Sequence, residues 1–237
     1  ALLVIGNEIL TGKTQDTNTV LLARMLCSVG IRLACVHVVP DVVDTIVSEV
    51  KSLSSEHDLL VTSGGIGPTH DDVTVEAVAK AFNTTVVVEP SMERLLRCHF
   101  GERTTDAHIL MARIPCGCDL FTLDNPWPTI RFKNVWVLPG IPEFFRARLS
   151  TMRKVLAGSR PFVSHAVFTN IEEPDLVPLL NRVVSLFPSV DIGSYPAWEN
   201  SEYRTKLTFD GLDETEVNQA LSLFVSELPN GEPLRTT

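Results

Sequence analysis

The sequence contains neither a long apolar run nor an excess of positive charge. The 237 residues include no apolar stretch of transmembrane length and no signal-peptide pattern. Lysine and arginine number 20 against 29 aspartates and glutamates, which gives a formal net charge of -9. A chain with this charge repels nucleic-acid phosphates and anionic lipid headgroups. We therefore expect neither a nucleic acid nor a membrane as a partner.

Cysteine is scarce, with five residues at no repeated spacing. An odd count argues against a disulfide framework, and the pair Cys116 and Cys118 has no second pair or histidine cluster to complete a zinc site. We therefore expect reduced thiols and a cytoplasmic protein. The chain begins inside an apolar strand without Met, so we expect an excised fragment, and an organellar form stays open.

Two familiar catalytic motifs are also missing. No serine stands in a G-x-S-x-G elbow, so nothing here indicates acyl transfer on an α/β-hydrolase pattern. The segment from Gly6 to Thr14 superficially resembles a Walker A loop, but five residues instead of four separate Gly6 from Gly12. Glu8 would also stand inside the anion-binding loop. A P-loop is therefore rejected in favour of a polar loop.

What the sequence does have is a regular alternation of apolar strands and amphipathic helices through its first two thirds. Short strands separated by helices pair in parallel through right-handed crossovers. We therefore predict an α/β fold with a doubly wound, mostly parallel sheet. The expected strands are 2–5, 31–39, 58–62 and 135–138, with short hairpin strands around 115–128, and the expected helices are 18–29, 40–53, 72–82, one after Pro90, and 143–156.

The pattern changes after a linker-like Gly-Ser-Arg-Pro segment at 158–161. The order becomes strand, helix, two strands and helix, which predicts a small C-terminal α+β satellite of the β-α-β-β-α type. The domain boundary is thus expected after residue 157, with a nucleotide-binding domain over 1–157 and the satellite over 158–237. The expected satellite elements are 162–168, 174–186, 190–195, 203–209 and 213–228.

The most informative segment is a glycine-rich stretch that follows a buried strand. Gly64, Gly65 and Gly67 lack a Cβ, so the backbone can take positive φ and approach a ligand closely. The helix expected after them presents N–H groups and the positive end of its dipole to an anion. The segment therefore predicts a phosphate-binding loop.

Two aspartates, Asp71 and Asp72, follow this loop directly. Carboxylates repel a phosphate unless a cation lies between them, and magnesium typically takes one or two carboxylates plus phosphate oxygens. The pattern therefore indicates attack on a phosphate or pyrophosphate. Thr69 with Asp72 also fits a capping-box-like helix start, so we expect one aspartate to face the ligand and the other to cap. His70 is a candidate for proton transfer or plain polar surface.

Two further loops are expected at the same edge of the sheet. The first is the polar loop that contains Glu8, Asp16 and Asn18, which are available for a metal, a ribose or helix capping. The second is the Pro139-Gly140 turn, because a strand that delivers the chain to a turn and then to a helix places that turn at the carboxyl edge.

Three motifs in order resemble the molybdopterin-binding-domain family: the Gly6-Asn7-Glu8-Ile9-Leu10 loop with Asp16-Thr17-Asn18, the stretch from Thr62 to Thr74, and Leu138-Pro139-Gly140-Ile141-Pro142. This family includes molybdenum-cofactor enzymes, bacterial competence-damage-inducible proteins and the N-terminal domain of eukaryotic FAD synthases. The FAD synthase branch is the most similar one. The sequence resembles it at residues 14–18, at residues 67–74, and at Gly193-Ser194-Tyr195-Pro196 with Trp198.

The resemblance implies hydrolysis of FAD to FMN and AMP with a divalent metal, which would be magnesium, manganese or cobalt. From the residues themselves we expect Asp71, Asp72 and Glu8 as metal ligands, and Asp71, Asp72 and His70 as catalytic residues. The resemblance also implies a FAD synthase (PAPS-reductase-like) domain after residue 237, and we expect a homo-oligomer. The expected binding residues are Gly6, Asn7, Glu8, Asp16, Asn18, Gly64, Gly65, Gly67, Thr69, Thr74, Pro139 and Gly140.

One residue departs from the family pattern. Asn7 stands where the family commonly has Asp, which removes a carboxylate from the first loop. Two alternatives therefore stay open beside the pyrophosphatase. One is a non-catalytic regulatory module that binds FAD or a pterin, and the other is a molybdopterin-binding or adenylating enzyme, or an ADP-ribose pyrophosphatase.

Overall fold

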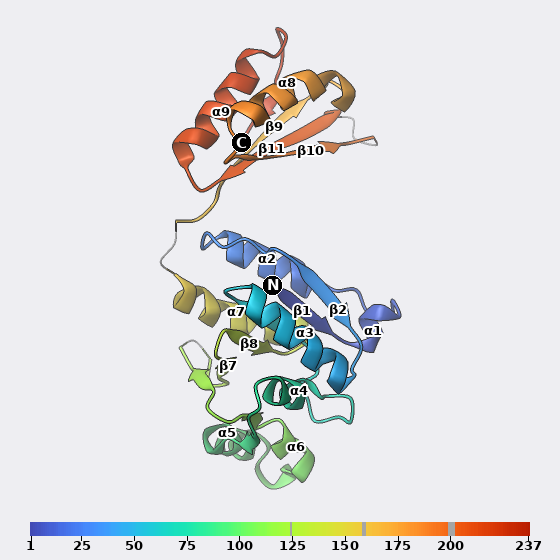
Figure 1. The fold of residues 1–237 in the computed structure, drawn as a ribbon, viewed down its shortest axis with the longest axis vertical. Helices are drawn as coiled ribbons and strands as arrows, with labels where there is room; N and C mark the ends of the chain where they lie inside the picture. The colour runs from blue at the N-terminus through green and yellow to red at the C-terminus, as the bar shows by residue number, and fades with distance from the viewer. Residues whose placement is uncertain (124, 158–159, 199–201) are drawn as a thin grey trace. The chain divides into compact units, whose positions relative to one another are not determined.

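The computed structural model describes residues 1–123, 125–157, 160–198 and 202–237. The chain divides into two compact units (Figure 1). The first comprises Ala1–Cys27 and Arg32–Gly158, and the second comprises Ser28–Ile31 and Ser159–Thr237. The boundary that the sequence predicts, between 157 and 158, falls at the edge of the undescribed pair 158–159.

A six-stranded sheet forms the centre of the first unit, in the order β2-β1-β3-β8-β7-β6. The first four strands are parallel, while β7 and β6 add an antiparallel edge. Every residue of β1, β3 and β8 is buried, which is typical of parallel strands covered on both faces. The strand bounds are β1 Leu2–Ile5, β2 Val36–Val39, β3 Leu60–Ser63, β6 Asp119–Phe121, β7 Thr129–Phe132 and β8 Val135–Leu138.

Helices cover this sheet, and a short antiparallel pair, β4 with β5, lies outside it. Leu3 packs in one core cluster with Ile46 of α3 and Val78 of α4. Successive side chains of a strand point to opposite faces, so the equally buried Leu2 and Val4 face the other way. The doubly wound α/β prediction is therefore confirmed. The remaining bounds are α1 Asn7–Leu10, α2 Asn18–Cys27, α3 Val43–Glu56, α4 Thr74–Ala81, β4 Val86–Val88, α5 Pro90–Phe100, η1 Gly101–Arg103, α6 Asp106–Leu110, β5 Arg113–Pro115 and α7 Pro142–Leu156.

Several predicted elements are shorter than the sequence pattern suggests, and two of them border the loops at the sheet edge. The expected strand 31–39 forms only as β2, because the register with β1 runs from Leu2 opposite Val36 to Ile5 opposite Val39. The helix expected over 72–82 begins at Thr74, because the residues before it form a separate turn. Apolar and amphipathic patterns mark an element but do not fix its ends.

The second unit is a four-stranded antiparallel sheet, β10-β11-β9-β12, with two helices. Residues of β11 alternate between buried and partly exposed, and the buried Leu207 and Phe209 pack with Val183 of α8 and Phe224 of α9. The predicted β-α-β-β-α order is confirmed, and the structure adds a two-residue strand, β12. The bounds are β9 Val163–Thr169, α8 Glu173–Leu186, β10 Asp191–Pro196, β11 Thr205–Gly211, α9 Glu214–Ser226 and β12 Arg235–Thr236.

Among the described residues, no helix has the length and apolar character needed to cross a membrane.

Candidate functional site

The carboxyl ends of β1, β3 and β8 meet at Gly64. This glycine has a φ of +107°, and a Cβ there would overlap the carbonyl oxygen of Ile5 at the end of β1. Its N–H donates to the carbonyl of Leu138 at 3.1 Å, and a Cβ on Gly140 would lie 3.2 Å from the Gly64 Cα. The structure thus confirms that the first loop, the glycine-rich loop and the Pro139-Gly140 turn share one edge of the sheet.

Asn18, the first residue of α2, links two of these loops through hydrogen bonds of its side chain. Its side chain is 5% exposed, and its Nδ2 donates to Ser63 Oγ at 2.9 Å and to the Gly140 carbonyl at 2.8 Å. A carbonyl oxygen only accepts, so the amide nitrogen must face Gly140. The Asn18 Oδ1 is then left buried without a partner among the described residues. Such an acceptor is unusual in a folded protein and fits a donor supplied by a ligand.

Thr74 fixes the shape of the glycine-rich loop. Its hydroxyl donates to the Gly64 carbonyl at 2.8 Å, and its N–H donates to the Gly65 carbonyl at 2.9 Å. Gly65 has a φ of +65°, and a Cβ there would overlap the Thr74 hydroxyl. Thr74 is fully buried, so it acts on the loop backbone from inside the protein.

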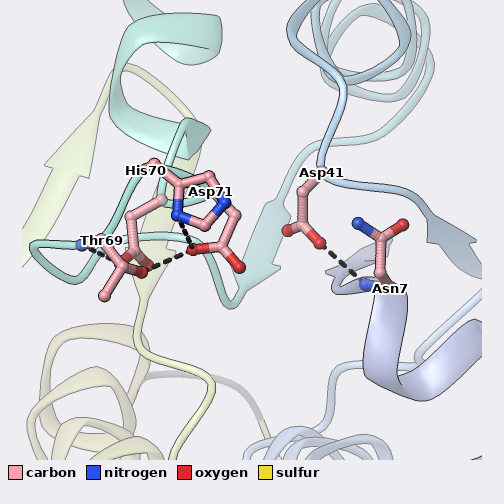
Figure 2. Close-up of polar contacts among 6 residues, drawn as sticks. Asn7, Asp41, Thr69, His70 and Asp71 are labelled. Carbon is pink, nitrogen blue, oxygen red and sulfur yellow. Dashed lines mark hydrogen bonds and ion pairs between the residues drawn. The ribbon is translucent and has the colours of Figure 1, made fainter.

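Thr69, Asp71 and Asp72 form a compact polar turn, and Figure 2 shows Thr69 beside Asp71. The Thr69 hydroxyl lies 2.6 Å from Asp71 Oδ1 and 2.6 Å from Asp72 Oδ2, and the Thr69 N–H donates to Asp72 Oδ2 at 2.8 Å. Helix α4 instead begins at Thr74 after Val73, without a side-chain cap. The capping prediction for Thr69 is therefore wrong, as is the expectation that the two aspartates diverge, because both carboxylates approach the same hydroxyl.

Hydrogen bonds within this turn favour the ionised form of the Asp71 carboxyl. Donation from the Thr69 hydroxyl, with help from the backbone N–H of Asp71, lowers the pKa of the Asp71 carboxyl below its ordinary value. His70 is 97% exposed, and its Nδ1 lies 3.9 Å from Asp71 Oδ1. Gly67 leaves space for the second carboxylate, since a Cβ there would lie 2.6 Å from Asp72 Oδ2.

The first loop folds into the short helix α1, and its backbone contacts a residue that sequence reasoning missed. The Asn7 N–H donates to Asp41 Oδ2 at 2.8 Å (Figure 2). Asp41 follows β2, so its carboxylate stands beside the loop that lacks one at position 7. In the sequence, only one feature points to Asp41 as a site residue: it is an acidic residue that follows a strand at the edge where the other loops are expected. A Cβ on the buried Gly6 would lie 2.6 Å from Glu8 Oε1, so Glu8 folds back over its own loop.

Asp16 has a capping role. Its Oδ1 accepts from the N–H groups of Asn18 at 2.9 Å and Thr19 at 3.2 Å, and its Oδ2 accepts from the Thr19 hydroxyl. These contacts satisfy free donors at the start of α2. Of the three uses that the sequence allowed for Asp16, capping is the one that the geometry shows.

The donor groups fit a hard divalent cation only in part. Within the described residues, no group of three or more His, Cys, Asp or Glu side chains could hold a metal, so Glu8 does not join Asp71 and Asp72 in one ligand set. Two neighbouring carboxylates do match magnesium, which keeps several waters and takes phosphate oxygens of a substrate as further ligands. The aspartate pair therefore fits an ion completed by substrate and water.

Comparison with known proteins supports the two-part organisation. Residues 1–158 match the family described as probable molybdopterin binding domain, and residues 161–236 match the family described as FAD synthase, middle domain. In solved structures, a CinA protein of unknown function from Thermoplasma acidophilum is similar, with a TM-score of 0.60 and 30% identity. That match covers 66% of this chain and 98% of the other.

Two relatives show how far the similarity extends. A probable FAD synthase of Caenorhabditis elegans is 30% identical over 96% of this chain and 49% of its own length. A protein of Archaeoglobus fulgidus is 33% identical over 93% of both chains. The chain thus spans about half the length of the worm relatives, which are 49% covered, and nearly all of the archaeal one. It belongs to the molybdopterin-binding-domain family, and its residues 161–236 are similar to the middle domain of FAD synthases.

Proposed function

We propose that the first unit is a divalent-metal-dependent pyrophosphatase that hydrolyses FAD to FMN and AMP. The observation that carries this proposal is the close placement of a glycine-rich loop and two converging carboxylates. Gly64 and Gly65 pack closely against Ile5 and Thr74 and thereby set the course of the loop at the sheet edge, while Asp71 and Asp72 lie at one hydroxyl in the same loop. A phosphate beside two carboxylates requires a cation between them.

We assign different roles to the residues of the site. Asp71 and Asp72 would hold the cation, which supplies charge neutralisation and activation of a water molecule when it is bound. The Thr69 hydroxyl contacts both carboxylates and lowers the pKa of Asp71. The water oxygen bonds to one phosphorus as the bridging P–O bond breaks. His70, which is exposed beside Asp71, can donate a ring N–H to a phosphate oxygen.

The buried end of the site has a second feature that suits a nucleotide. Asn18 Oδ1 is a buried acceptor without a partner among the described residues, at the same edge as Gly64 and Gly140. Ribose and ribityl hydroxyl groups are donors that could satisfy it.

The choice of FAD comes from the relatives. The second unit matches a FAD synthase middle domain, and the worm relatives carry the name probable FAD synthase. We propose on this basis that the protein acts in FAD metabolism. ADP-ribose, as a dinucleotide-like diphosphate, is the substrate to compare with FAD.

Two observations favour a second candidate, a regulatory module that binds FAD or a pterin without turnover. Asn7 replaces the family's usual carboxylate, and the described residues hold no three-ligand metal group. The Asp41 carboxylate at the Asn7 N–H weakens the first of these points, because it returns a negative charge to that loop.

The test is incubation of the purified chain with FAD and, separately, ADP-ribose and NADH, across magnesium, manganese and cobalt. Products are separated by chromatography, and Asp71→Ala and Asp72→Ala serve as comparison variants. The proposal requires metal-dependent release of FMN and AMP that both substitutions greatly reduce. Tight binding of FAD without product under any metal supports the regulatory module instead.

A further inference from the structure

The sheet of the second unit has one face that the helices of this unit leave uncovered. Helices α8 and α9 pack on the face that carries Leu207 and Phe209. Successive residues of a strand point to opposite faces, so Lys206 and Thr208 belong to the other face. We call this second face, which includes Lys206 and Thr208 of β11, the open face.

A row of four side chains crosses the open face, one from each strand. Tyr195 of β10 lies opposite Lys206 of β11. Phe168 of β9 lies opposite Lys206 on one side and opposite Arg235 of β12 on the other. Residues that lie directly opposite each other in an antiparallel pair share a face of the sheet. Two aromatic rings and two cations therefore lie on one face, and we call these residues the cross-strand row: Tyr195, Lys206, Phe168 and Arg235.

Both cations of the row converge on the Phe168 ring. The guanidinium carbon of Arg235 lies 4.1 Å from the ring centroid, and Lys206 Nζ lies 5.8 Å from it. Phe168 itself is buried, and the Tyr203 ring packs against it with a centroid distance of 4.9 Å. The ring attracts each cation, but the two like charges repel each other. An anion between Lys206 and Arg235 would offset that repulsion.

The two cations lack a carboxylate partner in the part of the chain that the structure describes, where neither Lys206 nor Arg235 forms an ion pair. The aspartates of the open face, Asp191 and Asp210, lie opposite each other four residues further along β10 and β11. That separation is roughly 13 Å at about 3.4 Å per residue. The row is thus a local positive site on a chain of net charge -9, and its charge is complementary to an anionic ligand.

Tyr195 gives the row an exposed aromatic surface next to Lys206. A Cβ on Gly193 would lie 2.8 Å from Tyr195 Cε2 and 2.7 Å from its Oη, so the ring lies along β10 over Gly193. Tyr195 is nevertheless 55% exposed. A tyrosine ring that is held on a strand and faces solvent can stack with a heteroaromatic ring. Both residues belong to the Gly193-Ser194-Tyr195-Pro196 motif, which the proposed pyrophosphatase does not use.

We propose that the cross-strand row binds a mononucleotide, with the phosphate between Lys206 and Arg235 and the heteroaromatic ring on Tyr195. Arginine and lysine donate charge-assisted hydrogen bonds to phosphate oxygens. The strands of Tyr195 and Phe168 are two strand spacings apart, about 10 Å, which the sugar or ribityl chain of a nucleotide would cross. FMN and AMP share this chemistry. The inference concerns the second unit alone and goes beyond the cleavage proposed for the first.

A single phosphate fits the row better than a nucleic acid does. Sheet faces with aromatic and basic side chains also bind single-stranded RNA, but that binding depends on several phosphates neutralised along the strand. The row has two cations, and a polymer of phosphates would meet the net negative charge of the chain. A mononucleotide brings one phosphate and one ring, which match the two cations and the exposed ring of the row.

The test is calorimetric titration of the full chain with FMN and, separately, with AMP in the presence of EDTA. Inorganic phosphate and riboflavin are titrated as the two parts of the ligand, and a short single-stranded RNA is titrated as the competing occupant. The variants are Lys206→Gln, Arg235→Gln and Tyr195→Ala. Arg182→Gln is the matched control, because Arg182 is exposed on α8 and pairs with Glu227. Circular dichroism verifies that each variant folds.

We expect FMN, AMP or both to bind, with about tenfold weaker affinity in Lys206→Gln and in Arg235→Gln and unchanged affinity in Arg182→Gln. Tyr195→Ala should weaken the binding of the nucleotides more than that of inorganic phosphate. Preference for FMN assigns the ring site to flavin, and preference for AMP assigns it to adenine. Absence of binding by both nucleotides, equal losses in Lys206→Gln and Arg182→Gln, or tighter binding of the RNA overturns the inference.

Asp71→Ala distinguishes the two units, because Asp71 lies in the first. This substitution should abolish FAD cleavage under the proposed function and leave the mononucleotide affinity with EDTA unchanged. Weaker binding of FMN and AMP in Asp71→Ala would assign the binding to the first unit and overturn the inference. FAD that stays intact with every metal contradicts the pyrophosphatase but leaves the cross-strand row as a binding site.

Discussion

The side-chain amide of Asn18 donates a 2.8 Å hydrogen bond to the carbonyl oxygen of Gly140, which lies 122 residues further along the chain. Its second amide hydrogen reaches Ser63 at the end of β3. One buried side chain thereby links the start of α2, the end of β3 and the turn after β8. The edge of the sheet that receives the ligand is held together from inside the protein.

This linkage predicts a stability cost at Asn18. Asn18→Ala leaves the carbonyl of Gly140 and the buried Ser63 hydroxyl without this donor, which should reduce the free energy of unfolding by about 1–3 kcal/mol. Urea unfolding followed by tryptophan fluorescence measures the change. Asn181→Ala, at an exposed position of α8, is the control and should change stability by less than about 0.5 kcal/mol. Equal effects of the two substitutions would contradict this role.

Gly64 should tolerate no side chain, in contrast to another glycine of positive φ. Gly64→Ala combines a φ of +107° with overlap of the Ile5 carbonyl, so the loop must move or the fold must weaken. Gly12 has a φ of +70°, but a Cβ there would have no atom within 4 Å, so Gly12→Ala should cost only about 1–2 kcal/mol of backbone strain. Thermal unfolding compares the two, and a smaller loss for Gly64→Ala would refute the packing argument.

Thr69 should control the ionisation of Asp71. The Thr69 hydroxyl lowers the Asp71 pKa, so Thr69→Val should raise that pKa toward its ordinary value, while Thr69→Ser should keep it low. A depressed carboxyl pKa contributes stability above the unfolded pKa, and this contribution is lost as the pH falls through the folded pKa. NMR titration of the Asp71 carboxyl carbon measures the shift. An identical pKa in Thr69→Val and wild type would show that the hydrogen bond has no such effect.

Cys118 should be the less reactive thiol of its pair. Burial, with smaller contributions from Asp119 and Cys116, raises the pKa of Cys118 to about 12. It is therefore a neutral thiol at pH 8, and its stabilising contribution is complete below the ordinary value of 9.0 and lost as the pH rises toward 12. Alkylation at pH 8 followed by mass spectrometry should label the exposed Cys116 first. Faster labelling of Cys118 would contradict its burial.

The sequence predicted the architecture because periodicity is a local property. The apolar run Val135–Leu138 was predicted with the observed bounds, and the glycine-rich loop was placed at the carboxyl edge through the same strand-helix order. Strand β12 was not predicted. Two residues, Arg235 and Thr236, have no period, and they form a strand only because β9 offers an open edge.

The details of the site depend on contacts that no local pattern encodes. Spacing alone suggested that Thr69 caps a helix, but the chain makes a separate turn there and both aspartates approach its hydroxyl. Asp41 lies outside the motifs in sequence and reaches the first loop because β2 pairs with β1 in the sheet. Such residues are found only when the fold brings them together.

The most direct test of the central claim is FAD hydrolysis in water enriched in oxygen-18, with magnesium, manganese or cobalt. If the chain is a pyrophosphatase, we expect one oxygen-18 atom from the solvent in the phosphate of either FMN or AMP. We expect no labelled nucleotide from Asp71→Ala. Mass spectrometry of both nucleotides identifies which phosphorus is attacked. Intact FAD after prolonged incubation with each metal, in a chain that demonstrably binds FAD, would contradict the pyrophosphatase and leave a binding module.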